Sequence, residues 1–326
     1  MKSALLSQKF HSRAAAAIML AVAALYVVLS GGLNNVLPSP GDTGFAFAAP
    51  GDWGLPYWWS LGLNVGLNVL IVIYMVALNR AFNVLRSMTW LHVGLFGLMQ
   101  GAIPRLVTQL NSGTLVCLTI VLCIYLMFSC FDDPGRVRTV FLAFMLLSLG
   151  CATQYCFILF IPIFWLVLAQ MRILSLRTFL ASLFGILTVW IILFGFGIIR
   201  PWELHLPRIV GAFEDMDYGA VIYLMVSAGV TAFMLLAGTM LNIMKTIAYN
   251  ARARAYNGAL TLIALATVGA MLLDFNNLLS YIPLLNMCAA YQITHYFVNH
   301  RYDRQYIGIL AVASVYVALY LWRLTL

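Results

Sequence analysis

Long apolar runs separated by short polar segments fill this chain from near its N-terminus to its C-terminus. A helix needs roughly 20 apolar residues to cross the ~30 Å hydrocarbon core of a bilayer. Eleven runs approach that length, and they lie at residues 14–33, 57–78, 88–103, 114–130, 140–152, 155–170, 178–199, 219–244, 258–273, 278–298 and 306–322. We therefore predict an all-α polytopic integral membrane protein with about eleven transmembrane helices and a single transmembrane domain over residues 1–326. The first run is long enough to be an uncleaved span and not a signal peptide.

Composition supports this class. Apolar residues make up 63% of the chain and charged residues only 9%, whereas an average soluble domain has about 25% charged residues. So few charges exclude a soluble globular protein, a disordered chain and a nucleic-acid-binding protein. The runs are apolar throughout, which also excludes an outer-membrane barrel, because its strands alternate apolar and polar residues.

The distribution of charge predicts the orientation of the helices. Cytoplasmic loops of membrane proteins collect Lys and Arg. With the N-terminus in the cytoplasm and the C-terminus outside, 14 of the 18 Lys and Arg fall on the inner side and seven of the ten acids fall on the outer side. We therefore expect a multi-pass protein of the bacterial inner (cytoplasmic) membrane, with its main outer loops at 34–56 and 200–218.

The apolar stretch between Arg138 and Arg172 can form one helix or two. One helix would place Arg138 and Arg172 on opposite sides of the membrane. Two short helices that turn at residues 150–154 would place both arginines in the cytoplasm. We predict the short helical hairpin at 140–170 and leave open whether it crosses the membrane fully or re-enters.

The predicted spans hold no Asp, Glu, Lys or Arg near their centres. Buried charges mark proton and ion pathways, so an ion-coupled transporter is disfavoured. The second span carries Gly62 and Gly66, four residues apart, and Asn64 and Asn68 at the same spacing. We predict that these four residues make a close helix–helix contact with an amide hydrogen bond.

The outer loops hold the residues with the most reactive chemistry. The first loop contains Asp42 and Asp52 and no basic residue. Arginine forks bind phosphate, and clustered carboxylates bind divalent cations. The loop at 200–218 offers both kinds of group: Arg200, Arg208, Glu214, Asp215 and Asp217. The cofactor is unknown, and a divalent metal at the three acids is the candidate. The acids also suit the positive end of the helix that follows them, so a purely local role stays open.

Two apolar segments carry a family resemblance. They are VFLAFMLLSLGCATQYCFILFIPIFWLVLAQMRILSLRTFLASLFGILTVWIILFGFG at 140–197 and IPLLNMCAAYQITHYF at 282–297. Their pattern resembles an uncharacterised family of polytopic inner-membrane proteins of Bacteroidota, which implies the fold and no activity. More distantly, the layout is similar to the membrane glycosyltransferases that use polyprenyl-phosphate sugars. That resemblance implies a catalytic carboxylate at Asp42 or Asp52 and lipid-phosphate ligands at Arg105, Arg200 or Arg208.

Three functions fit these features. The first is a non-catalytic subunit or scaffold of cell-envelope assembly, which contacts membrane lipid and other membrane proteins. The second is a glycosyltransferase-like enzyme that acts on a lipid-linked sugar at the outer face. The third is a lipid or small-molecule transporter without ion coupling. We expect the first, because the spans lack central charges and the sequence holds no nucleotide-binding, hydrolase or zinc-protease motif.

Overall fold

The computed structural model describes residues 9–29, 44–200, 202, 204, 218–246, 248–299 and 305–325. Within these residues the chain forms helices and turns, with no strand, which confirms the all-α fold class. The twelve α-helices are α2 (Arg13–Leu29), α3 (Tyr57–Phe82), α4 (Leu91–Gly101), α5 (Pro104–Thr108), α6 (Ser112–Phe128), α7 (Val137–Thr153), α8 (Cys156–Gln170), α9 (Leu176–Gly195), α10 (Tyr218–Thr246), α11 (Ala251–Leu273), α12 (Leu278–Asn299) and α13 (Gln305–Thr325). The short 3-10 helices are η1 (Pro50–Asp52) and η3 (Phe275–Asn277).

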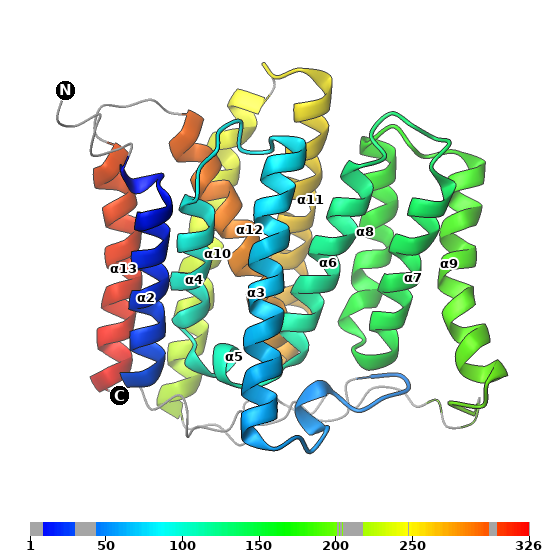
Figure 1. Cartoon of the computed structure of the whole chain (residues 1–326), viewed down its shortest axis with the longest axis horizontal. Coiled ribbons are helices and arrows are strands. Elements are labelled where there is room, and N and C mark those ends of the chain that lie inside the picture. Colours follow the sequence, from blue (N-terminus) through cyan, green and yellow to red (C-terminus); the bar gives the residue numbers. More distant parts are fainter. Residues whose placement is uncertain are drawn as a thin grey trace.

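The longer helices stand side by side in one bundle, from α13 and α2 at one edge to α9 at the other (Figure 1). Five of them, α3, α9, α10, α11 and α13, are each long and apolar enough to cross a membrane. The shorter helices α2, α6, α7 and α8 are also apolar. The described residues therefore form a helical bundle of the kind found in multi-pass membrane proteins.

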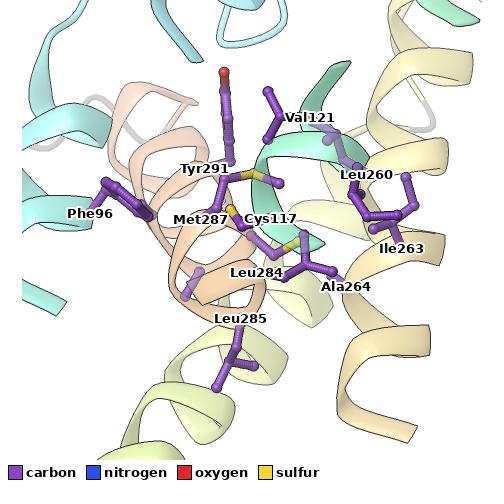
Figure 2. Close-up of a cluster of buried hydrophobic side chains, with 14 of the residues drawn as sticks. Phe96, Cys117, Val121, Leu260, Ile263, Ala264, Leu284, Leu285, Met287 and Tyr291 are labelled. Carbon is purple, nitrogen blue, oxygen red and sulfur yellow. The ribbon is translucent and has the colours of Figure 1, made fainter. Parts of the chain in front are cut away.

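The centre of the bundle is α12. Nineteen of its 22 residues are buried, because α4, α6, α10 and α11 all pack against it. Figure 2 shows side chains from α4, α6, α11 and α12 meeting in this core, among them Phe96, Cys117, Ile263 and Met287. A helix that is covered on all sides contacts protein and not lipid, and this permits the polar residues that α12 carries.

The third predicted span is shorter in the structure than in the sequence pattern. The apolar run at 88–103 forms α4, which has 11 residues and a length of about 16 Å. A helix of that length cannot cross the hydrocarbon core alone. Ten of its residues are buried by neighbouring helices, and the chain continues into α5, a helix that the hydrophobic pattern did not predict.

The predicted break in the 140–170 region is confirmed. Helix α7 ends at Thr153 and α8 begins at Cys156, so the turn lies at the end of the predicted 150–154 segment. Helix α7 packs against both α8 and α9. The contact with α9 is close at Gly185, where an added Cβ would lie 2.5 Å from the carbonyl oxygen of Phe141.

The two ends of the bundle differ in charge. At the end where α2 and α4 begin and α3 ends, the chain places eleven of the described Lys and Arg residues, and we call this the basic end. They are Lys9, Arg13, Arg80, Arg86, Arg136, Arg138, Arg172, Arg177, Lys245, Arg252 and Arg254. The opposite end holds the other three described basic residues, Arg105, Arg200 and Arg323.

Candidate functional site

The opposite end holds three of the residues that the sequence nominated for chemistry. Asp52 is the last residue of η1 and is exposed. Arg105 is half-buried in α5, where burial and then the charge of Arg323 lower its pKa. Arg200 lies beyond α9 with its guanidinium carbon 6.0 Å from the centre of the Trp202 ring. Within the described residues, no ion pair joins Asp52 to Arg105 or Arg200.

The remaining nominated outer residues lie outside the described part of the chain. They are Asp42, Arg208, Glu214, Asp215 and Asp217. The phosphate site at Arg208 and the metal site at the three acids therefore stay predictions. Across the described residues, no group of three or more His, Cys, Asp or Glu side chains is placed to hold a metal ion.

The four residues nominated for helix packing divide into two kinds. Asn64 is buried and donates hydrogen bonds from its side-chain amide to the backbone oxygens of Leu106 and Val107, at 2.7 and 2.8 Å. Asn68 donates to the backbone of its own helix, at Asn64.

Gly62 and Gly66 are exposed, and a Cβ added at either would meet no atom within 4 Å. The glycines therefore do not make the predicted contact with another helix of this chain, because they face away from the bundle. Asn64 faces into the bundle and anchors α3 to the α5 segment.

A polar network that the sequence analysis missed lies where α7 meets α8 and α11 meets α12. The carboxylate of Asp274 accepts hydrogen bonds from the hydroxyls of Tyr155, at 2.6 Å, and Tyr281, at 2.9 Å. Burial and the bond to Asp274 raise the pKa of Tyr155, so this phenol stays protonated and remains a donor. The two tyrosines come from different helix pairs, and Asp274 therefore ties the two turns together.

The amides around Asp274 extend the same network. Asn277 donates to the Cys156 sulfur at 2.7 Å, and Gln154 donates to the Ser280 hydroxyl at 3.0 Å. Ser280 in turn donates to the side-chain oxygen of Asn277 at 2.7 Å. These four residues are buried. Their polar atoms bind one another, which is the arrangement of a structural network.

The described part of the loop between α2 and α3, residues 44–56, covers the α7–α8 turn. The backbone N–H groups of Ala46 and Phe47 both donate to the carbonyl oxygen of Ala152, at 3.1 and 2.9 Å. Gly44 sits so close to this turn that an added Cβ would lie 2.8 Å from the Ala152 oxygen. Glycine permits that approach because it has no side chain. The α7–α8 turn is therefore covered by contacts within the chain.

Comparison with protein families, curated proteins and solved structures gives no match. The two resemblances drawn from the sequence therefore stay predictions.

Proposed function

We propose that this chain is an eleven-span protein of the bacterial inner membrane that acts as a non-catalytic component of cell-envelope assembly. Its N-terminus lies in the cytoplasm and its C-terminus lies outside. In this assignment α2, α3, α6 and each helix from α7 to α13 cross the membrane once, and α4 together with the α5 segment makes the remaining crossing.

The charge difference between the two ends supports this orientation. Eleven described basic residues lie at the basic end and three at the opposite end. Lys and Arg collect on the cytoplasmic side of inner-membrane proteins, so the basic end is assigned to the cytoplasm. The same assignment places Asp52, Asp274 and the loop that covers the α7–α8 turn on the outer side.

The observation that carries the non-catalytic proposal is the open face of α3. Gly62 and Gly66 lie one turn apart with free space beside them, and Trp58 and Trp59 are exposed one turn further along. Small residues let a second helix approach closely, which is how membrane helices associate. We assign this face to another membrane protein of the assembly.

Two glycine pairs test this assignment. Gly62→Leu with Gly66→Leu should abolish complementation in a strain that depends on this protein, at normal protein level, because the leucines block the approach of a partner helix. The matched control is Gly229→Leu with Gly269→Leu, two helical glycines that also have no atom within 4 Å of an added Cβ. The control should complement fully.

The same assay separates a scaffold from an enzyme. If Asp52→Asn or Arg200→Lys abolishes complementation while the double leucine variant at Gly62 and Gly66 complements, the glycosyltransferase-like function replaces the proposal. A photo-crosslinking residue at Leu63, which is exposed beside the two glycines, should capture a membrane protein. The same residue at Val226, on an exposed position of α10, should capture none.

A further inference from the structure

A cationic cavity lies at the basic end, where α2 begins, α3 ends and α4 begins. Its volume is about 280 Å³, and its walls include Arg13, Arg80, Trp90 and His92. The guanidinium carbons of Arg13 and Arg80 lie 5.0 and 5.6 Å from the centre of the Trp90 ring. Among the described residues, neither arginine forms an ion pair with a carboxylate. Two cations therefore share one cavity and one aromatic ring, and no carboxylate of the described residues neutralises them.

The frame of this cavity is built by hydrogen bonds. The Trp90 backbone N–H donates to the carbonyl oxygen of His11, and the His11 ring bonds the Thr89 hydroxyl at 2.8 Å. These bonds hold the segment that carries Arg13 against the start of α4. The side chain of Asn79 bonds the backbone of Leu85 at 3.0 Å, which fixes the end of α3 that carries Arg80.

A histidine is buried in the cavity wall. His92 is 1% exposed, and its ring lies beside the backbone of Met75 and Thr89. Because an imidazole nitrogen can donate or accept a hydrogen bond, the ring adds a third polar group to the wall of the cavity. The cavity thus presents two guanidinium groups and one imidazole to a group that accepts hydrogen bonds.

A separate apolar groove lies farther along the same three helices. It has a volume of about 270 Å³, its floor is α4 and its sides are α2 and α3. On α3 the groove and the cavity are lined from one face, by Val65, Val69 and Val72 for the groove and by Val76 and Arg80 for the cavity. These residues are three and four positions apart, so they lie on one side of the helix. The groove therefore lies on the same side of α3 as the arginines, farther toward the middle of the bundle.

The spacing and charges suit a phospholipid. The step of eight residues from Arg80 to Val72 corresponds to roughly 12 Å at 1.5 Å per residue, so the near end of the groove lies within one leaflet of hydrocarbon, which is about 15 Å thick. The mouth of the groove is lined by exposed apolar side chains, Leu20, Val69 and Ile73. In the bilayer these residues face lipid, so an acyl chain can enter sideways without crossing water.

We propose that the α2–α3–α4 groove binds one anionic phospholipid of the cytoplasmic leaflet, with its phosphate between Arg13 and Arg80 and one acyl chain between α2 and α3. Arginine forks give paired, charge-assisted hydrogen bonds to phosphate oxygens. Anionic lipids are concentrated in the leaflet that basic segments face. The leaflet depends on the proposed orientation, but the binding itself does not depend on the scaffold function.

Native mass spectrometry tests the proposal on the full-length protein. The protein is released from nanodiscs that contain phosphatidylcholine and phosphatidylglycerol in equal amounts, and retained lipid is counted. Wild type should retain one phosphatidylglycerol in preference to phosphatidylcholine. Arg13→Gln with Arg80→Gln should reduce this retention about tenfold or more, because each arginine loses a charge-assisted hydrogen bond. Arg138→Gln with Arg177→Gln, which removes two exposed charges at the same end, should retain the lipid as wild type does.

A groove-filling variant tests the acyl chain separately. Ala24→Phe places a ring between α2 and α3, where Ala24 lines the groove, and leaves both arginines in place. It should lose the long-chain lipid but still bind short-chain dihexanoyl phosphatidylglycerol. Equal retention of phosphatidylglycerol and phosphatidylcholine by wild type would by itself overturn the proposal. Retention of long-chain phosphatidylglycerol by Ala24→Phe would also overturn it. So would a mass that shows a second copy of the chain and no bound lipid.

Discussion

The two ends of the bundle use polar residues in opposite ways. At the opposite end, Asp274 binds Tyr155 and Tyr281, and the amides beside it bind one another. At the basic end, Arg13 and Arg80 meet no described carboxylate. Both ends are rich in polar side chains. Around Asp274 the chain supplies the hydrogen-bond partners, whereas the described chain supplies no counter-charge to Arg13 and Arg80, and this makes the cationic cavity the better candidate for a ligand.

The largest expected effect is at Asp274. Asp274→Ala removes the acceptor of two tyrosine hydroxyls, and a hydrogen bond to a charged group contributes about 1.5–3 kcal/mol. We expect the free energy of unfolding to fall by about 3 kcal/mol, measured by denaturation in detergent. Asp133→Ala is the control, because its ion pair with Arg136 is exposed and should contribute less than about 1 kcal/mol. Equal losses from both variants would contradict a structural network at Asp274.

The second effect is at the loop that covers the α7–α8 turn. Gly44→Val places a side chain against the backbone oxygens of Ala152 and Thr153, and overpacking of this kind costs about 1–3 kcal/mol. The loop should leave the α7–α8 turn. A membrane-impermeant reagent should then label Thr153→Cys more strongly in the Gly44→Val background than in the protein that keeps Gly44. Unchanged labelling would show that the loop does not cover the α7–α8 turn.

The third effect should be small in the absence of lipid. Arg13→Gln with Arg80→Gln removes two cation–π contacts, each contributing about 0.5–1 kcal/mol. Added phosphatidylglycerol should stabilise wild type against thermal unfolding, because a ligand that binds the native state raises its stability. It should not stabilise the variant. A lipid-free loss as large as that of Asp274→Ala would show that these arginines are structural.

The smallest effect is a pH dependence at His11. Burial lowers the pKa of His11 from its ordinary value near 6.5, with the Gln305 side chain acting in the other direction. Because the folded pKa is below the unfolded one, the contribution to stability is present above pH 6.5 and is lost as the pH falls below it. Between pH 7.5 and 5.5, wild type should therefore lose more thermal stability than His11→Gln. An equal loss would show that protonation of His11 does not account for the pH dependence.

The sequence predicted the elements better than their contacts. The break between α7 and α8 was predictable because arginines flank both helices, and charge determines which side of a membrane a loop occupies. The outward face of Gly62 and Gly66 was not predictable. In a membrane, the side of a helix that meets lipid is as apolar as the side that meets protein, so hydrophobic spacing does not distinguish them.

The Asp274 network was also beyond local pattern. Tyr155 and Asp274 are 119 residues apart, and no motif joins a tyrosine at one turn to an acid at another. The single available signal was an acid that directly follows an apolar run, at the end of the 258–273 segment. Similarly, Arg13 and Arg80 were read as parts of a cytoplasmic charge pattern. Their shared cavity emerges only when α4 brings α2 and α3 together.

The buried position of α12 has a consequence for the order in which this protein is made. Its four packing partners, α4, α6, α10 and α11, all precede it in the chain, so each is synthesised before α12 leaves the ribosome. Asn286 and Gln292 would be costly to expose to lipid, but they meet waiting partners in Gln100 and Asn242. A chain that ends before residue 278 would therefore leave the side-chain amides of Gln100 and Asn242 without these two partners.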